Sequence, residues 1–300
     1  MLAEPPRVNR AESAGDRRTR RLLIGLCVLL VGLFLVLPLG VIFWHALGEG
    51  LRAYGAAVLD RATFRAAGLT LLTTAIAVPL NTLFGVAAAW AVTKFDFRGK
   101  SLLVTLIDLP FSISPVVAGL CLVLLFGANG LLGAYVNRTY VVSLGLFSLE
   151  LSTRIIFALP GIVLATVFIT FPFVARELIP LMQAQGTEEE QIARVLGANG
   201  WQIFWRVTLP NIRWGLLYGV ILCTARAMGE FGAVYVVSAG SSDQVTLPLH
   251  VERVYYANMV RVVPAFAVAS LLAGVSVITL AVKAAVEWRF KGELKRKHGG

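Results

Sequence analysis

Six stretches of this chain are long and apolar enough to cross a lipid bilayer as helices. A bilayer core needs about 20 apolar residues in helical form, and the stretches cover residues 22–47, 68–92, 102–126, 155–174, 215–237 and 263–286. Hydrophobic residues make up 57% of the chain and charged residues only 15%, whereas soluble domains carry roughly 25% charged residues. The sequence therefore predicts an all-α integral membrane protein and excludes an ordinary soluble enzyme.

Two segments need a separate interpretation. Residues 131–149 are moderately apolar but contain Asn137, Arg138 and Ser143, so an interfacial loop with a short helix is predicted there. The first apolar stretch is longer than the 7–15-residue core of a signal peptide, and no small-residue cleavage site follows it. We expect residues 22–47 to be a retained membrane helix.

The basic residues are distributed unevenly between the two sides of the predicted bundle. Nineteen of the 27 lysines and arginines lie in the tails (1–21 and 287–300), at the end of the sixth stretch (Lys283), or in the loops after the second and fourth stretches. Seven lie on the other side, and Arg226 lies within a span. Cytoplasmic loops are enriched in Lys and Arg. The chain is therefore expected in a bacterial inner membrane, with both termini on the cytoplasmic side. The net charge of +10 then reflects topology and anionic lipid rather than nucleic acid.

Motifs for catalysis or metal binding are absent from the sequence. Gly99-Lys100-Ser101 matches the end of a P-loop, but Lys94 stands where that motif needs its first glycine. The cysteines Cys27, Cys121 and Cys223 are far apart, as are the three histidines, which gives no metal or disulfide framework. We expect no catalytic site, metal or cofactor in this chain.

Residues 187–210 form the most informative polar loop. Thr187 and Glu190 have the spacing of a capping box, and the acidic run suits the positive end of a helix dipole. One face of this first helix is apolar, and residues 197–200 break it. Aromatic residues recur at helical spacing in a second helix, which Pro210 is expected to end. The pattern predicts a helix–turn–helix that binds either lipid or a groove on a partner protein.

The spacing in this loop resembles the EAA loop of ABC importer permeases. In that pattern Glu-Ala-Ala, three residues and Gly are followed by nine residues and Ile-x-Leu-Pro; here Gly197 is followed by nine residues and Val207-Thr208-Leu209-Pro210. Gln191-Ile192-Ala193 replaces Glu-Ala-Ala. The resemblance implies a coupling helix seated on an ATP-hydrolysing subunit, with the contact drawn from Thr187, Glu188, Glu189, Glu190, Ala193, Gly197, Ala198, Trp201, Phe204, Trp205, Leu209 and Pro210.

A wider resemblance covers residues 65–285. The segment WQIFWRVTLPNIRWGLLYGVILCTARAMGEFGAVYVVSAG, followed by LPLHVERVYY and AFAVASLLA, is similar to permeases of sulfate/thiosulfate ABC importers; ARAMGEFGAV also resembles molybdate permeases. The resemblance implies a six-helix type I ABC importer transmembrane domain over residues 65–286 that transports sulfate and thiosulfate. It implies a heterodimer with a related permease, two ATPase subunits that bind ATP and Mg, and an extracytoplasmic sulfate-binding protein.

Several polar residues lie inside the predicted spans, where charge is costly and often functional. Arg226 and Glu230 are four residues apart, so they either line an anion path or form a packed ion pair. Ser112 and Ser114 lie beside the two prolines of the third stretch and either contact a passing oxyanion or bond their own backbone. The Asp108 carboxylate would repel sulfate, so Asp108 is expected to cap a helix or to pair with a positively charged residue.

Three points remain open from the sequence. Residues 215–219 have a G-x-x-x-G pattern, which packs helices within the chain or forms a subunit interface. The main alternative function is a molybdate or tungstate ABC permease. A secondary anion transporter predicts inverted repeats, and a membrane enzyme predicts a nucleophile or metal set; neither feature is evident in the sequence.

Overall fold

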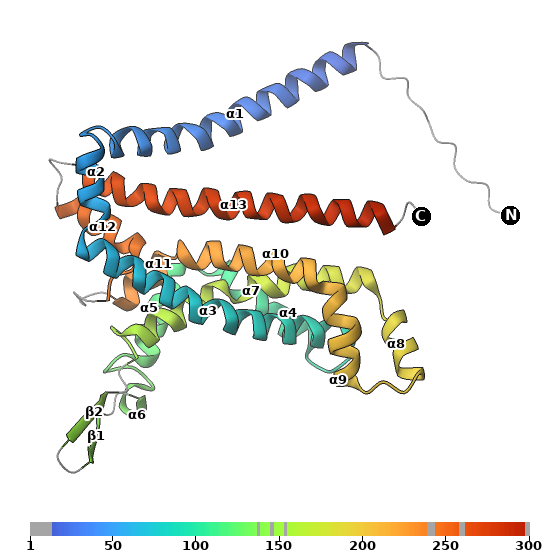
Figure 1. Ribbon diagram of the computed structural model, residues 1–300. Helices are drawn as coiled ribbons and strands as arrows, with labels where there is room; N and C mark the ends of the chain where they lie inside the picture. Colours follow the sequence, from blue (N-terminus) through green and yellow to red (C-terminus); the bar gives the residue numbers. More distant parts are fainter. Residues whose placement is uncertain are drawn as a thin grey trace.

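The structure is a computed structural model that describes residues 14–136, 139–144, 147–152, 155–238, 244–257 and 262–297. Long helices dominate it (Figure 1). Four are long and apolar enough to cross a membrane singly, namely α1 (Ala14–Ala46), α3 (Arg61–Lys94), α7 (Leu159–Gln185) and α13 (Val263–Lys297). Two bent helix pairs pass the same test. All six predicted apolar stretches are therefore confirmed as helical.

Shorter elements connect the long helices. They are α2 (Leu51–Val58), α6 (Gly133–Val136), α8 (Glu188–Val195), α9 (Gly200–Ile203), a π-helical turn (Phe204–Thr208) and α12 (Leu247–Ala257). The start of α1, the end of α13 and the α8–α9 segment lie at one end of the molecule, on the right of Figure 1, and α2 lies at the other. We call these the α8–α9 end and the α2 end.

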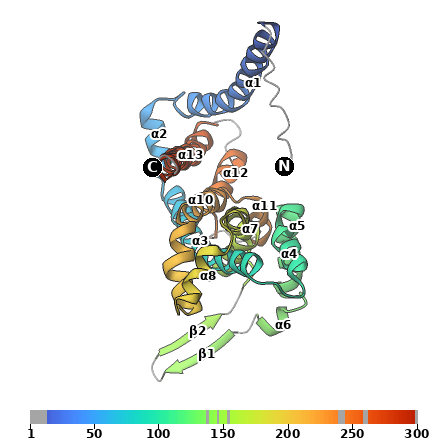
Figure 2. The same cartoon turned by 90° about the vertical axis from the view of Figure 1, so that its right-hand side faces the viewer.

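The region predicted as an interfacial loop contains a β-hairpin in addition to the expected short helix. Strands β1 (Thr139–Leu144) and β2 (Phe147–Ser152) pair antiparallel and project from the bundle (Figure 2). The sequence analysis missed this hairpin. Its signal is the strict alternation of apolar and polar residues in FSLELS, which is the period of a strand rather than of a helix.

The third predicted stretch is sharply bent. Helices α4 (Lys100–Ser112) and α5 (Pro115–Phe126) meet at an angle of 109°. Ile113 and Ser114 are extended between them because the residue before a proline avoids the helical region. Pro110 is accommodated inside α4, so the second proline rather than the first makes the break.

Two predicted helix ends are wrong. The fourth stretch was expected to end at residue 174, but α7 continues to Gln185 and includes Arg176, which the sequence analysis had placed in a loop. Pro210 was expected to end the second helix of the loop. Instead that helix runs on through the π-helical turn into α10 (Leu209–Met228), and Pro210 follows directly after this irregular turn. A 48° bend then separates α10 from α11 (Gly232–Ser238).

Helix α7 forms the centre of the bundle. It packs against α3, α10, α11, α4 and α5 and contributes buried Ile162, Val174 and Leu178. A buried hydrogen bond of 2.6 Å from Asn81 Nδ2 to Thr170 Oγ1 ties α3 to α7. By contrast, the most apolar 18-residue stretch of α1 contains no buried residue, and α1 leaves the bundle at an angle (Figure 2).

Glycines permit the close approach of α3 and α10 to α7. A Cβ atom at Gly219 would lie 3.3 Å from the Val174 Cα atom, and one at Gly215 would meet the Leu181 side chain. The G-x-x-x-G face is thus used for helix packing inside the chain. On α3, a Cβ at Gly85 would lie 2.7 Å from the Val174 Cβ.

We expect Gly85→Ala to lower the thermal midpoint of the purified chain in detergent, because overpacking a core costs about 1–3 kcal/mol. Gly68→Ala is the matched control on the same helix: a Cβ there meets nothing within 4 Å, and alanine favours helix over glycine by up to ~1 kcal/mol. Thermal denaturation of both variants checks the prediction. An equal or higher midpoint for Gly85→Ala would contradict the packing described here.

Candidate functional site

The α8–α9 segment, residues 187–210, is built from two helices joined by a tight turn. Helix α8 ends in a Schellman motif: Gly197 N–H bonds Arg194 O at 3.0 Å, and Ala198 N–H bonds Ala193 O at 3.0 Å. Gly197 has φ +88°, a conformation that side chains disfavour. The predicted break after α8 is confirmed, and its cause is the backbone of Gly197 rather than a lack of space, since a Cβ there meets nothing within 4 Å.

The predicted capping box at Thr187 is wrong. Thr187 makes no side-chain cap, and its hydroxyl instead accepts a hydrogen bond of 3.0 Å from Gln191 Nε2. A capping box is found at the start of α9, where Asn199 Oδ1 accepts from Gln202 N at 2.8 Å and Gln202 Oε1 accepts from Asn199 N at 3.0 Å. The earlier motif fails because the Glu190 carboxylate has stronger partners elsewhere.

Glu190 links α8 to the helices of the bundle. Its Oε1 lies 3.1 Å from Lys94 Nζ, at the end of α3, and accepts a 2.7 Å hydrogen bond from Thr208 Oγ1 in the π-helical turn. Lys94 also donates to Gly186 O at 2.6 Å. The Lys94 side chain is only 8% exposed, and breaking a shielded ion pair is costly. We call Glu190, Lys94 and Thr208 the Glu190 link; sequence reasoning did not find its pairing.

Three further contacts hold the segment and its flanks in place. Asn211 Nδ2 donates to Glu189 Oε2, and Gln185 Nε2 donates to Asn211 O at 2.9 Å. The ring of Phe204 packs against Trp90 of α3, with centroids 5.3 Å apart. Glu188 is exposed. The segment is therefore fixed to the bundle by its acidic turn and by one of its three aromatic residues.

The outer surface of the segment is apolar and open. Val195 is 88% exposed and Trp201 68%, and Ile192, Leu196 and Trp205 are also exposed. The hollow between α8 and the following helix has a volume of about 330 Å³ and is lined by Ala193, Leu196, Gly197, Ala198, Gln202, Ile203, Arg206 and Val207. Large exposed apolar patches rimmed by polar residues mark interaction surfaces. The segment thus has the form of a docking surface.

Arg226 and Glu230 form the expected ion pair at the bend between α10 and α11, with 2.6 Å between Arg226 Nη1 and Glu230 Oε2. Glu230 is 1% exposed at its side chain, and its Oε1 accepts a 3.0 Å hydrogen bond from Ala233 N at the start of α11. The pair therefore joins the end of α10 to the start of α11, as a packed ion pair would. The predicted role of these residues in an anion path stays a prediction.

Ser112 and Ser114 lie at the α4–α5 bend and are exposed. This bend packs against the α10–α11 bend: a Cβ at Gly232 would lie 3.0 Å from Pro115 Cβ, and one at Gly119 would lie 2.7 Å from Ala233 O. The structure thus brings two of the predicted path elements, the broken third and fifth stretches, next to one another.

A second charged pair lies on the surface of the bundle, between α7 and α4. Arg176 Nε of α7 donates to Asp108 Oδ1 of α4 at 2.7 Å, which confirms that Asp108 pairs. The Arg176 guanidinium lies 4.9 Å from the centroid of the Phe111 ring, and Phe111 contacts Phe173 at 5.2 Å. The sequence signal was the polar pair Arg176-Glu177 after an apolar run, which was interpreted as a loop.

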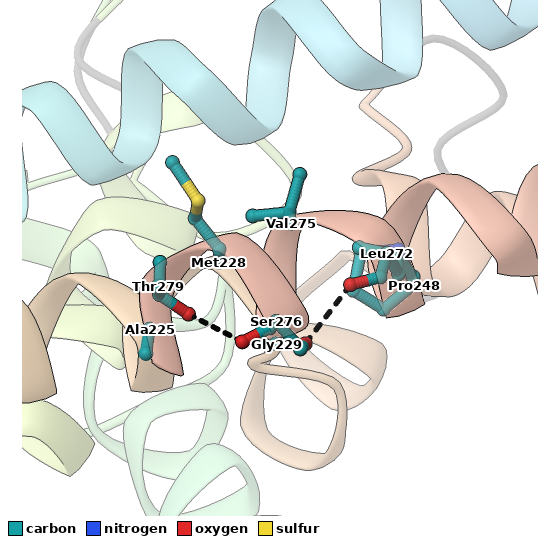
Figure 3. A pocket seen from close by; sticks show the side chains of 8 residues that line it. All are labelled: Ala225, Met228, Gly229, Pro248, Leu272, Val275, Ser276 and Thr279. Atoms are coloured by element: carbon teal, nitrogen blue, oxygen red, sulfur yellow. Dashed lines mark hydrogen bonds between the residues drawn. The ribbon is translucent and has the colours of Figure 1, made fainter. Parts of the chain in front are cut away.

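One small pocket lies between α10, α12 and α13 (Figure 3). Its volume is about 90 Å³, and its lining residues, Ala225, Met228, Gly229, Pro248, Leu272, Val275, Ser276 and Thr279, carry no charge. Both hydroxyls bond their own helix, Ser276 to Leu272 O and Thr279 to Ser276 O, each at 2.9 Å. We do not assign an anion site to this pocket.

Comparison with known proteins identifies the family. Residues 81–292 match the model of the family described as the binding-protein-dependent transport system inner membrane component, which is more than half of the chain. The chain belongs to this family. Membership in the inner membrane component family confirms the predicted permease resemblance and the all-helical membrane fold, the short hairpin apart.

Several members of the family are similar over nearly the whole chain. The sulfate transport system permease protein CysW of Synechococcus elongatus is 48% identical over 294 residues, which cover 96% of this chain and 98% of that protein. CysW of Escherichia coli is 42% identical over 296 residues, 98% of this chain and 97% of its own length. The Escherichia coli permease protein CysT is 34% identical over 215 residues, 72% of this chain and 73% of its own.

A solved structure has the same fold. A chain of the bacterial alginate ABC transporter, crystallised with an alginate pentasaccharide-bound periplasmic protein, superposes with a TM-score of 0.68 over 91% of this chain and 95% of that chain. Their sequences are 14% identical, so this likeness concerns the fold alone.

Proposed function

We propose that this chain is the membrane-spanning, non-catalytic permease subunit of an ATP-driven importer of sulfate, with thiosulfate as a second substrate. The observation that supports it best is the α8–α9 segment: an open apolar surface, fixed to α3 by the Glu190 link and to α10 by the Glu189–Asn211 hydrogen bond, in a chain 42–48% identical to CysW proteins. An exposed apolar surface of this kind is typical of a protein–protein interface, and the ATPase subunits of an ABC importer are the partners that fit it.

The proposed topology places the α8–α9 end on the cytoplasmic side of a bacterial inner membrane. The start of α1 and the end of α13 lie at this end (Figure 1), together with most of the lysines and arginines. Arg176, although part of α7, lies in the half of that helix nearest the same end. Positive residues favour the cytoplasmic side, so both termini are assigned there.

Energy coupling follows from the charge of the substrate. Moving one charge against 100 mV costs about 2.3 kcal/mol, and a dianion entering a negative cell therefore costs roughly 4.6 kcal/mol before any concentration gradient. A passive path would release sulfate from the cell. We infer that two ATPase subunits bind ATP and Mg, that one of them docks on the α8–α9 segment of this chain, and that their closure moves the bundle through the Glu190 link.

The other proposed partners are a related permease and an extracytoplasmic sulfate-binding protein. The chain is 34% identical to CysT as well as more similar to CysW, which favours a heterodimer of two related permeases. Selection of the anion is assigned to the binding protein, so the permease needs a weak, polar path rather than a tight site.

Uptake of labelled sulfate by proteoliposomes tests this function. The vesicles contain this chain with its partner permease, ATPase and binding protein. We expect ATP-dependent uptake that Gly197→Asp lowers by about tenfold, because a non-glycine residue at positive φ costs about 1–2 kcal/mol and the new charge lies on the docking surface. Gly50→Asp is the matched control: Gly50 also has φ +88° but lies before α2, at the other end.

The outcomes separate the alternatives. Uptake without ATPase, or full uptake by Gly197→Asp, contradicts the ABC assignment. Equal losses in Gly197→Asp and Gly50→Asp indicate general misfolding and contradict a specific role for the segment. Uptake of molybdate but not of sulfate would support the ABC importer assignment and would change the assigned substrate to molybdate.

A further inference from the structure

The Arg176–Asp108 pair is unusual because it is both charged and exposed on the membrane part of the bundle. The Arg176 side chain is 55% exposed and that of Asp108 37%. Around them the surface of α4 is apolar, with Leu102, Leu106 and Phe111 exposed. A surface of this composition faces either lipid or something that the isolated chain does not contain.

The depth of the pair argues against the water interface. Arg176 lies nine residues before the end of α7 at Gln185, which is about 13 Å along the helix axis. Asp108 lies eight residues after the start of α4 at Lys100, or about 12 Å. If the roughly 40 Å of α7 is centred on a hydrocarbon core about 30 Å thick, Arg176 lies about 8 Å inside that core.

Lipid is an unfavourable neighbour at this depth. Ionisable residues within membrane spans almost always face the bundle interior or a water-filled cavity, because charge in hydrocarbon is costly. The bundle interior lies on the other side of α7, where Val174 and Ala175 are fully buried. A water-filled space is therefore the favourable surrounding for the exposed pair, and in a permease heterodimer the path between the two subunits is such a space.

The chemistry of Arg176 differs from that of Arg226. The buried Glu230 uses its second oxygen to bond the start of α11, so the Arg226 pair is part of the fold. Arg176 gives Asp108 one hydrogen bond, from Nε; among the described residues no other hydrogen bond is recorded for its guanidinium, which has five N–H donors. The donors on the η nitrogens are thus available to an oxyanion.

We propose that Arg176 is the cationic contact for the dianion in the translocation path and that Asp108 is its counter-ion when the path is empty. This rests on the proposed function and names the residue that serves it. An arginine without a counter-ion would hold a dianion more tightly, whereas conduction needs sites that release it. Asp108 competes for the guanidinium, which makes the contact short-lived, and Arg guanidinium groups suit oxyanions through their planar fork of donors.

Four variants in the reconstituted complex separate a path role from a structural ion pair. We expect Arg176→Gln to lower sulfate uptake by about tenfold or more, the loss expected for one hydrogen bond to a charged group. Asp108→Asn is expected to change uptake by less than about threefold, and the double variant to remain as poor as Arg176→Gln. Arg176→Lys keeps the positive charge but loses the planar arrangement of N–H donors, so its sulfate uptake should lie between that of the wild type and that of Arg176→Gln.

A structural pair gives a different pattern. Either single change would then leave an unpaired charge and lower uptake to a similar extent, while the double variant would recover it. That pattern, or full uptake by Arg176→Gln, overturns the proposal. Wild-type complex that imports no sulfate overturns the proposed function itself, so the two failures are distinguishable.

Thiol labelling tests water access without relying on transport. In the assembled complex with Cys27 and Cys121 replaced by alanine, Arg176→Cys should react with an anionic, membrane-impermeant thiosulfonate, and sulfate should slow the reaction relative to chloride. Ala175→Cys, at a fully buried neighbour, is the matched control and should stay unlabelled. An unreactive cysteine at position 176 would show that lipid or protein covers it and would overturn the proposal.

Discussion

Replacing Trp201 with alanine is expected to weaken binding of the ATPase subunits to the permease by about 30-fold. This prediction rests on the proposed docking of those subunits. Trp201 is 68% exposed and stacks on Phe204, with centroids 5.9 Å apart, so its indole is held in place but uncovered. Aromatic anchors of this kind are binding hot spots worth about 2 kcal/mol or more, which corresponds to about 30-fold in affinity.

The measurement is titration of the ATPase onto permease heterodimers in nanodiscs, with Trp44→Ala as the control. Trp44 is equally large and exposed but belongs to α1, at the α2 end of that helix (Figure 1). Trp205→Ala should resemble Trp201→Ala. Equal affinities for the Trp201→Ala, Trp44→Ala and wild-type proteins would contradict the docking surface and favour the lipid-anchor interpretation of the loop.

Apart from the β1–β2 hairpin, whose local alternation was missed, the sequence was informative where the physical cause is local. Length and apolarity located all six helical stretches, because crossing a bilayer sets a minimum run of apolar residues. The turn at Gly197 was found because a glycine after a periodic helix marks its end. The pairing of Arg226 with Glu230 followed from helix geometry alone, since residues four apart share a face.

The errors arose where distant segments decide the local structure. Thr187 and Glu190 have capping-box spacing, yet Lys94, almost a hundred residues earlier, takes the carboxylate. Arg176 and Glu177 ended the predicted span because their charge lowers local hydropathy, but Asp108 on another helix compensates Arg176. Pro210 was interpreted as a stop because a single sequence does not show that the preceding turn is π-helical.

Glu190→Gln is expected to uncouple ATP hydrolysis from transport, raising the ATP consumed per sulfate imported by about tenfold. The reason is the position of the Glu190 link. Its carboxylate is the shared partner of Lys94 on α3 and Thr208 before α10, so movement of α8 reaches both helices through it. Removing the charge loses the ion pair and weakens the hydrogen bond, a loss of about 1.5–3 kcal/mol for a charged partner, and a factor of ten corresponds to about 1.4 kcal/mol.

Lys94→Met should have a similar effect, and the double variant should be little worse than either single change, because both remove the same interaction. Glu188→Gln is the matched control: it removes an equal charge from the same first turn of α8, but Glu188 is exposed. ATPase activity and sulfate uptake measured in the same proteoliposomes give the ratio. If Glu190→Gln and Glu188→Gln keep the wild-type ratio, α8 does not transmit its motion through Lys94. The α8–α9 segment would then act on the bundle through the Glu189–Asn211 or Phe204–Trp90 contacts.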